Sequence, residues 1–506
     1  MESMTFILFG ATGDLAKRKI FPALYNLFLD QKMPDSISII GLGRREMSDR
    51  EFQNQVEQSL RTFSRRIDFD RTNLYKFLDA FRYSEFNAVN PEDYRKLLSL
   101  VKQRENERNI PENRMFYLSV APEFFDLISL NIKESGLGST KGWKRLIIEK
   151  PFGRDLESAR ELNTRLSEAF EEDEIYRIDH YLGKPMVQNL EALKFANPIL
   201  QPLWNNQHIA NIQITASEVV GVEERAGYYD QAGAIRDMFQ NHMLQMLMMT
   251  AMNQPKKMNA NEIRNEKRKI IESLRGLKKE DVSLHVVRGQ YRSGEAYGMQ
   301  LAGYTEEPGV NPTSKNDTFV AAKVMIDNEN WQGVPFYIRT GKRMKIKSTR
   351  IVIEFKDSLK ELYENKNEKI IPNLLIIEIN PNENITLQLN HKNPLHDGKI
   401  EPVKINFSAE QKGVPEAYER LIFDAFRGDS TFFAHWKEVE MSWEWVQPIL
   451  DAFKENLLPL HLYEAGSNGP DAAESLLKAD GFKWWLDEVD LEENEENKSE
   501  LEFITH

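Results

Sequence analysis

Cysteine is absent from this sequence, and its absence removes several chemistries at once. Disulfides, thiolate nucleophiles and zinc–thiolate sites all require it, so we expect none of them, and no metal centre. The N-terminal apolar run, Phe6–Phe9, is too short for a secretory signal, and no run approaches the length of a membrane span. These absences predict a soluble protein of a reducing compartment, the cytoplasm.

The chain also lacks an excess of basic charge. Its 66 lysine and arginine residues are outnumbered by 79 aspartate and glutamate residues, and the formal net charge is −13. Nucleic acids and anionic membranes attract a dense basic surface, so neither is an expected partner. Positive charge is local, and each group is either an anion site or ordinary solvated surface. The groups are Lys17, Arg18 and Lys19; Arg44 and Arg45; and Lys342, Arg343, Lys345 and Lys347.

The length of 506 residues exceeds what one hydrophobic core supports, so we expect two or three domains, and the patterns along the chain favour two. Over residues 1–180, apolar runs alternate with helical patterns, which predicts an α/β, Rossmann-like, doubly wound domain. Over 181–485, many strand-like runs follow one another directly, which predicts an α+β domain with a large, mainly antiparallel sheet. Residues 486–506 are acidic and are expected to form a frayed tail. The expected strands are 4–9, 37–40, 115–120 and 146–148, then 209–219, 317–325, 336–340, 349–355, 374–379, 385–389 and 403–407.

A glycine turn follows the first strand run. Gly10-x-x-Gly13-x-x-Ala16 precedes a helical pattern over 17–28. Backbone amides at such a turn can approach a pyrophosphate at the start of a helix, so the pattern predicts a dinucleotide site. The alternative is a tight turn that binds no ligand.

The end of the second strand run indicates which dinucleotide is bound. Arg44 and Arg45 stand where a guanidinium can accept a ribose 2′-phosphate, which favours NADP over NAD. Glu46 follows them, and an acidic residue at this place suits a ribose 2′-hydroxyl. NAD is therefore retained as a weaker alternative cofactor.

Residues 177–184, Arg-Ile-Asp-His-Tyr-Leu-Gly-Lys, place a carboxylate, an imidazole, a phenol and a lysine together. A helical pattern follows, and Pro185 suits its first position. Gly183 and Lys184 are thus expected at a helix N-terminus, where free amides attract phosphate. The stretch predicts an anion site beside a proton transfer. An ordinary strand-to-helix corner with a hydrogen-bonded histidine is the alternative.

Polar residues stand just before the apolar run Met243–Met249, which must be mostly buried. Among them, Asp237 and His242 are candidates for acid–base chemistry, because an alcohol dehydrogenation needs a base of near-neutral pKa. Five residues apart on an α-helix, they would lie roughly 140° apart around its axis and flank a cleft. A packed structural histidine is the alternative.

Five segments in this order resemble the motif set of the glucose-6-phosphate dehydrogenase family, and the resemblance spans nearly the whole chain. The segments are Gly10–Lys19, Glu149–Asp155, Arg177–Lys184, Asp237–His242 and Val334–Lys342.

The resemblance implies roles position by position. His242 matches the family's general base and Asp179 the carboxylate paired with it. The positions that match substrate-binding residues are His180, Tyr181, Lys184, Lys150, Glu218, Asp237, Lys342 and Lys347. Those on the cofactor side are Gly10, Thr12, Gly13, Asp14, Leu15, Arg44, Tyr117, Lys150 and Pro151.

Two positions depart from the family pattern. Asn380 stands where many relatives carry glutamine, which leaves its sugar contact open. Pro185 replaces a common glutamate, and its place at a helix start makes that change harmless.

The resemblance implies oxidation of D-glucose 6-phosphate to 6-phospho-D-glucono-1,5-lactone by NADP, the first step of the oxidative pentose phosphate pathway. It also implies a homodimer or homotetramer. Two rivals stay open: a dehydrogenase of another phosphosugar or of free aldoses, and an NADP-binding sensor or scaffold without turnover.

Overall fold

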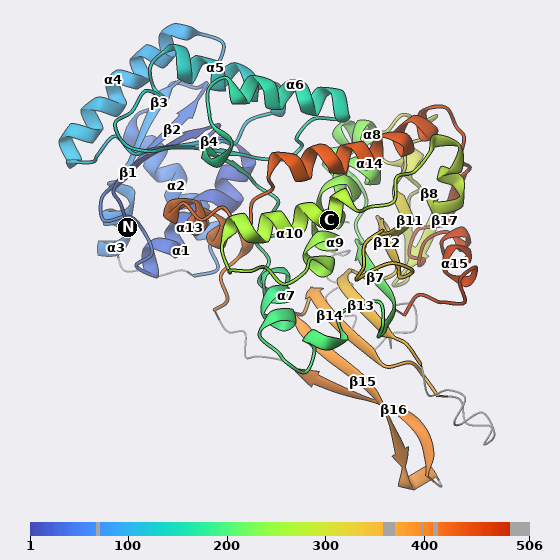
Figure 1. Cartoon of the computed structure of the whole chain (residues 1–506). Coiled ribbons are helices and arrows are strands. Elements are labelled where there is room, and N and C mark those ends of the chain that lie inside the picture. Colours follow the sequence, from blue (N-terminus) through green and yellow to red (C-terminus); the bar gives the residue numbers. More distant parts are fainter. Residues whose placement is uncertain (67–70, 358–369, 397, 408–412, 486–506) are drawn as a thin grey trace. The chain divides into compact units, whose positions relative to one another are not determined.

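The computed structural model describes residues 1–66, 71–357, 370–396, 398–407 and 413–485 (Figure 1). The chain forms two compact units. The first contains Met1–Lys184 together with two later segments, Lys257–Arg264 and Gly413–Glu440. The second contains the remaining described residues. Sequence periodicity predicts a single boundary near residue 180 and does not reveal that later segments return to the first unit. The acidic tail, 486–506, lies outside the described residues.

The first unit is built on a six-stranded parallel sheet with the order β3-β2-β1-β4-β5-β6. This is the predicted doubly wound arrangement, with β1 and β4 adjacent at its centre. Every residue of β1, β2 and β4 is buried, as expected for parallel strands covered on both faces. The strands are β1 (Met4–Phe9), β2 (Ile37–Gly43), β3 (Phe81–Glu85), β4 (Arg114–Leu118), β5 (Lys144–Ile148) and β6 (Ile175–Arg177).

Helices cover both faces of this sheet, with α4 and α5 on one side and α1 and α13 on the other (Figure 1). Leu421 and Ile422 of α13 join the core that β1 and α1 form, which explains why residues 413–440 belong to this unit. The helices are η1 (Ala16–Ile20), α1 (Phe21–Leu29), α2 (Asp49–Phe63), α3 (Arg71–Leu78), α4 (Pro91–Arg108), η2 (Pro122–Phe124), α5 (Phe125–Glu134), α6 (Leu156–Ser167), η3 (Glu172–Glu174) and α13 (Ala417–Arg427).

The second unit contains a nine-stranded mixed sheet with the order β16-β15-β14-β13-β7-β12-β11-β8-β17. Most neighbours are antiparallel, as predicted, but β7 pairs with β12 and β8 with β17 in parallel. The strands are β7 (Ile209–Ser217), β8 (Val286–Arg292), β11 (Phe319–Met325), β12 (Pro335–Gly341), β13 (Ser348–Phe355), β14 (Leu374–Asn380), β15 (Asn384–Asn393), β16 (Lys399–Phe407) and β17 (Leu460–Glu464). A separate hairpin joins β9 (Gly294–Ala296) and β10 (Met299–Leu301).

Several helices complete the second unit, and α10 and α14 each have residues in both units. They are α7 (Pro185–Phe195), η4 (Gln201–Leu203), η5 (Glu223–Arg225), α8 (Ala226–Ala234), η6 (Ile235–Met243), α9 (Leu244–Ala251), α10 (Ala260–Glu272), η7 (Lys279–Asp281), α11 (Val282–His285), η8 (Tyr304–Glu306), η9 (Pro394–His396), α14 (Trp436–Lys454) and α15 (Asp471–Lys478). Among the described residues, no helix is both long and apolar enough to cross a membrane.

A buried lysine ties α7 to α9. Lys194 is 2 % exposed, and its ammonium donates to the carbonyls of Met249, Thr250 and Met252 at 3.3, 2.8 and 2.6 Å. These carbonyls lie at the C-terminus of α9, where a helix leaves acceptors unsatisfied and favours positive charge. The contact therefore fixes α7 against the helix that directly continues η6.

Candidate active site

The glycine turn after β1 has the geometry that a dinucleotide site needs. Gly10 has φ +79°, and a Cβ there would lie 2.1 Å from the carbonyl oxygen of Ser119. Only glycine fits such a position. The amide of Gly13 donates to the carbonyl of Gly10 at 2.9 Å, which closes the turn before η1 begins at Ala16. The residues present thus fit the pyrophosphate of a dinucleotide.

The element after this turn differs from expectation. Residues Ala16–Ile20 form a π-helix, and the α-helix begins only at Phe21. A local change from α to π geometry is frequent at functional sites. Within this π-helix Lys17 is partly exposed, Arg18 and Lys19 are exposed, and Arg18 pairs with Asp14 at 2.7 Å.

The arginine pair lies directly beyond β2. Arg44 and Arg45 are both exposed, and the Tyr83 hydroxyl donates to the carbonyl of Arg45 at 2.6 Å, which holds the backbone of the pair. A Cβ on Gly43 would lie 3.1 Å from the Thr12 side chain, so glycine lets the two loops approach. Exposed guanidinium groups next to the glycine turn suit a 2′-phosphate.

The carboxyl ends of β4 and β5 carry the next predicted residues. Tyr117 is fully buried in β4, and Lys150 and Pro151 follow β5 through a cis peptide bond. Glu149 lies directly before Lys150, and its Oε1 accepts a hydrogen bond from the Tyr117 hydroxyl at 2.6 Å. Ligands of doubly wound folds bind at this edge of the sheet.

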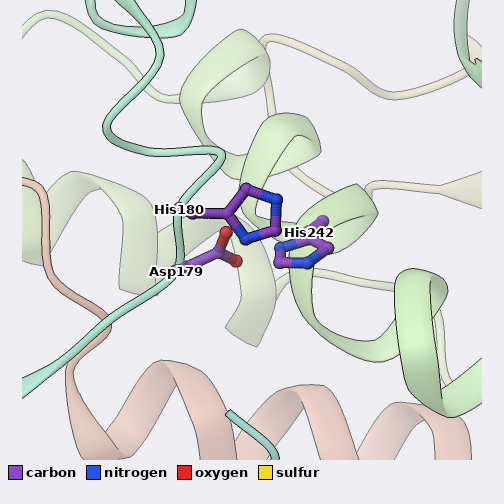
Figure 2. Close-up of side chains that lie close together, drawn as sticks. All are labelled: Asp179, His180 and His242. Carbon is purple, nitrogen blue, oxygen red and sulfur yellow. The ribbon is translucent and has the colours of Figure 1, made fainter. Parts of the chain in front are cut away.

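The segment Asp179–Lys184 connects β6 to α7, which begins at Pro185. Its first two residues, Asp179 and His180, are labelled in Figure 2. Asp179 is 3 % exposed, and its Oδ1 accepts from the amide of Tyr181 at 2.9 Å. The Lys184 ammonium lies 4.4 Å from the centre of the Tyr181 ring. The segment therefore holds His180, Tyr181 and Lys184 in one turn of the first unit.

Gly183 is required in that turn. A Cβ there would lie 2.7 Å from the carbonyl oxygen of Ala417 at the start of α13. The absence of a side chain lets α13 pack against the turn.

Glu218 and Lys342 meet in the second unit. They follow the parallel strands β7 and β12, whose last residues, Ser217 and Gly341, pair in register. The amide of Glu218 donates to the carbonyl of Gly341 at 3.0 Å, and the Lys342 ammonium forms an ion pair with the Glu218 carboxylate. Because the ends of parallel strands meet at one sheet edge, the topology brings the two side chains together.

Asp237 and His242 lie on η6, which is a π-helix over Ile235–Met243. His242 is labelled in Figure 2. The 140° separation expected for an α-helix is wrong here, because a π-helix closes its hydrogen bonds over five residues. Residues five apart then lie nearly one above the other, so Asp237 and His242 share a face. Their exposures are 3 % and 0 %.

Polar groups surround Asp237. The Tyr228 hydroxyl and the Arg225 guanidinium both lie 3.4 Å from its Oδ1. Burial and the Asp237 charge raise the pKa of Tyr228 to about 12. Asp237 is therefore a buried carboxylate that the Tyr228 hydroxyl and the Arg225 guanidinium contact, and it can accept hydrogen bonds from hydroxyl groups.

Lys347 lies apart from these groups in sequence, in the loop that joins β12 to β13, and is partly exposed. Asn380, the position that departs from the family pattern, ends β14 and pairs with Thr349.

Tyr229 is a member of the second-unit site that the sequence analysis missed. Its ring lies 5.2 Å from the Lys342 ammonium, and its pKa is raised well above the usual value by burial and by nearby Asp237 and Glu218. It connects the strand-end pair with η6. In the sequence, Tyr229 stands in the segment Gly227-Tyr-Tyr-Asp230, which could have indicated a functional role. Two adjacent aromatic residues, however, are usually interpreted as part of a hydrophobic core.

A glycine turn at the centre of a doubly wound sheet, together with a buried histidine and a buried carboxylate on a π-helix, suits a nicotinamide-dependent oxidoreductase. Comparison with known proteins identifies the family within this class. Residues 7–189 match the family model "Glucose-6-phosphate dehydrogenase, NAD binding domain", and residues 191–485 match "Glucose-6-phosphate dehydrogenase, C-terminal domain". The chain belongs to the glucose-6-phosphate dehydrogenase family.

Related proteins are similar to this chain in sequence over almost its full length. Glucose-6-phosphate 1-dehydrogenase of Bacillus subtilis is 48% identical over 95% of this chain and 97% of its own. The enzyme of Aggregatibacter actinomycetemcomitans is 42% identical over 96% and 97%. A solved structure of glucose-6-phosphate dehydrogenase in complex with its substrate glucose-6-phosphate has a TM-score of 0.87 at 33% identity, covering 96% of this chain and 98% of that one.

Proposed function

We propose that this chain oxidises D-glucose 6-phosphate to 6-phospho-D-glucono-1,5-lactone and passes the hydride of C1 to NADP. It is an NADP-dependent oxidoreductase acting on a CH–OH group. The observation that carries this conclusion is family membership over both domains, 7–189 and 191–485. This reaction is the first step of the oxidative pentose phosphate pathway.

The acid–base step belongs to His242 and Asp179 in this proposal. His242 takes the proton of the C1 hydroxyl as the C1–H bond breaks, and the electron pair of that bond leaves with the hydride. NADP, when bound, supplies the hydride acceptor. Asp179 orients the imidazole and stabilises its cation, as a carboxylate does in other acid–base pairs. Its Oδ1 is held by the amide of Tyr181, which fixes the carboxylate plane.

Substrate binding is divided between the two ends of the sugar. His180, Tyr181 and Lys184 hold the phosphate, supported by the helix start at Pro185. The sugar hydroxyls bind to Glu218 and Asp237, and the family resemblance implies further contacts from Lys342, Lys347 and Lys150. Asp237 is 3 % exposed, and a hydrogen bond to its carboxylate is stronger there than in water because the local dielectric is low.

The cofactor binds along the first unit. Gly10, Thr12, Gly13, Asp14 and Leu15 would hold the pyrophosphate of bound NADP, and the Arg44 guanidinium would donate hydrogen bonds to its 2′-phosphate. Tyr117, Lys150 and Pro151 line the nicotinamide side.

An absorbance assay with two sugars and two cofactors tests the function. We expect NADP reduction with glucose 6-phosphate, and at least about 100-fold lower kcat/KM with glucose, because a site built for phosphate loses charge-assisted hydrogen bonds without it. Activity with NAD should be weaker. Equal rates with glucose would favour a free-aldose dehydrogenase, and NADP binding without turnover would favour a sensor.

Lys184 provides the test of the phosphate site. Lys184→Ala is expected to raise KM for glucose 6-phosphate by about 10- to 100-fold, the value of one lost charge-assisted contact, and to change kcat much less. Initial rates at a series of glucose 6-phosphate concentrations measure both KM and kcat. Lys392→Ala, an exposed lysine of β15, is the control. A change confined to the NADP constant would contradict the phosphate role.

Cytoplasmic location and assembly as a homodimer or homotetramer are further parts of the proposal. The absence of cysteine suits a reducing compartment. Light scattering on the purified full-length chain measures the assembly state.

A further inference from the structure

A buried hydrogen-bonded cluster joins three elements of the first unit. The Tyr117 hydroxyl of β4 donates to Oε1 of Glu149 at 2.6 Å, and the Tyr418 hydroxyl of α13 donates to Oε2 at 3.3 Å. Glu149 directly follows β5, and β4 and β5 are neighbours in the sheet. Both carboxylate oxygens are therefore held, one from each side.

The position of this cluster relative to the cofactor follows from the sheet order. The glycine turn follows β1, and Arg44 follows β2, so the adenosine half lies on the β1–β2 side. The second mononucleotide of a dinucleotide binds on the other side of the central strand pair, over β4 and β5. Glu149 thus stands on the nicotinamide side, next to Lys150.

The surroundings of Glu149 let it hold or release a proton near neutrality. Burial is the main cause that raises its pKa to about 7. The two phenols and the Lys150 ammonium lower the pKa, and the Asp179 carboxylate raises it. These are the groups that face Glu149 from β4, α13, its own loop and the segment after β6.

The reaction changes charge on this same side. The oxidised nicotinamide ring is a cation, and acceptance of a hydride neutralises it. A carboxylate nearby attracts the cation, whereas a neutral carboxyl does not distinguish the two forms in this way.

We propose that Glu149 sets the relative affinity of the enzyme for NADP⁺ and NADPH, favouring the oxidised cofactor when ionised and releasing this preference when protonated. Tyr117 and Tyr418 position its carboxyl for that role. This inference rests on the proposed function, since it requires NADP as the cofactor. By linkage, NADP⁺ makes Glu149 more acidic by the factor by which ionisation strengthens NADP⁺ binding.

The ratio of two dissociation constants tests the proposal. On the full chain without sugar, the Kd values of NADP⁺ and NADPH are measured by NADPH fluorescence and competition, at a series of pH values on both sides of neutrality. Both cofactors carry the 2′-phosphate, so its titration cancels in the ratio. We expect Kd(NADPH)/Kd(NADP⁺) to rise by about tenfold with pH in the wild type, the effect of a pKa shift of one unit. Glu149→Gln should make the ratio independent of pH.

Tyr418→Phe is the second variant. It removes a donor to the ionised carboxyl, so the midpoint of the rise should move to higher pH while the total change persists. A melting curve for each variant verifies that it is folded. A flat wild-type ratio, or the same rise in Glu149→Gln, would overturn the inference. Failure to bind NADP or to oxidise glucose 6-phosphate would instead overturn the proposed function.

Discussion

Replacing His242 by asparagine is expected to lower kcat with glucose 6-phosphate and NADP by about 10³-fold, within the range measured for loss of a general base. Asparagine keeps a polar group of similar width but accepts no proton near neutral pH. His242 is fully buried on η6, so no bulk water replaces it easily as a base. Steady-state rates at saturating concentrations of both substrates measure the change. Turnover within a few fold of the wild type would remove His242 from the mechanism.

Two measurements separate a chemical role of His242 from a structural one. The acidic limb of the kcat/KM profile, which reports the base of the free enzyme, should disappear in His242→Asn, whereas a folding defect would scale the whole profile. The Kd of NADP should stay within about twofold, because the cofactor residues lie on other elements. His391→Asn is the matched control, since His391 is exposed on β15.

The predicted fold class, a doubly wound sheet followed by a large, mainly antiparallel sheet, is confirmed, and periodicity explains why. Parallel strands buried on both faces appear as uninterrupted apolar runs, as in Phe6–Phe9 of β1. The strands that were missed are short or carry charge. They are β3 (Phe-Arg-Tyr-Ser-Glu), β6 (three residues), β8 (ending Gln-Tyr-Arg) and β17 (Leu-His-Leu-Tyr-Glu), together with the β9–β10 hairpin. β3, β6 and β17 lie at the edges of their sheets, where polar side chains cost little.

Long-range packing and helix type are not encoded in local periodicity. Nothing near residue 420 indicates that Leu421 and Ile422 complete a core begun by β1. Likewise the pattern around Asp237 and His242 fits an α-helix, and only the structure shows the π geometry that places both on one face. Local pattern predicts the glycine turn, Arg44 and the polar residues Asp237 and His242, whereas the role of each residue comes from the family resemblance, and the pairing of Asp179 with His242 stays a prediction.

Strand-end topology explains a further part of the site that motifs alone do not. Glu218 and Lys342 are more than a hundred residues apart, yet both are the first residues after parallel strands in register. Their ion pair follows from that register. Mixed sheets thus create a local site of the kind usually associated with all-parallel folds.

The loops that carry Glu218 and Lys342 are held by one buried carboxylate, that of Glu307. It accepts hydrogen bonds from the Tyr291 hydroxyl at 2.6 Å and from the amides of Val222 and Glu223 at 3.2 and 3.1 Å. It also pairs with the Arg343 guanidinium at 3.3 Å. The side chain of Glu307 is 5 % exposed and that of Arg343 11 %, so the charges are largely desolvated.

Glu307→Ala is therefore expected to lower the free energy of unfolding by about 3–5 kcal/mol, the cost of leaving a buried charge unpaired. Arg343 adds to the effect, because it already has φ +52°, a strained conformation for a residue other than glycine that its neighbours must hold in place. Denaturant unfolding measures the loss. Glu306→Ala is the matched control, because Glu306 is exposed and bonds to the amide of Gly303 at 2.8 Å, and it should cost about 1 kcal/mol or less.

The same variant has a functional consequence that separates loop positioning from general destabilisation. In the fraction of Glu307→Ala that stays folded at low temperature, KM for glucose 6-phosphate should rise, because the loops bearing Glu218 and Lys342 lose a common anchor. The Kd of NADP should not change, since the residues of its site belong to the first unit. Equal weakening of both ligands would mean that Glu307 supports the whole fold. A loss of stability below about 1 kcal/mol would mean that backbone bonds such as Glu218 to Gly341 suffice to hold the loops.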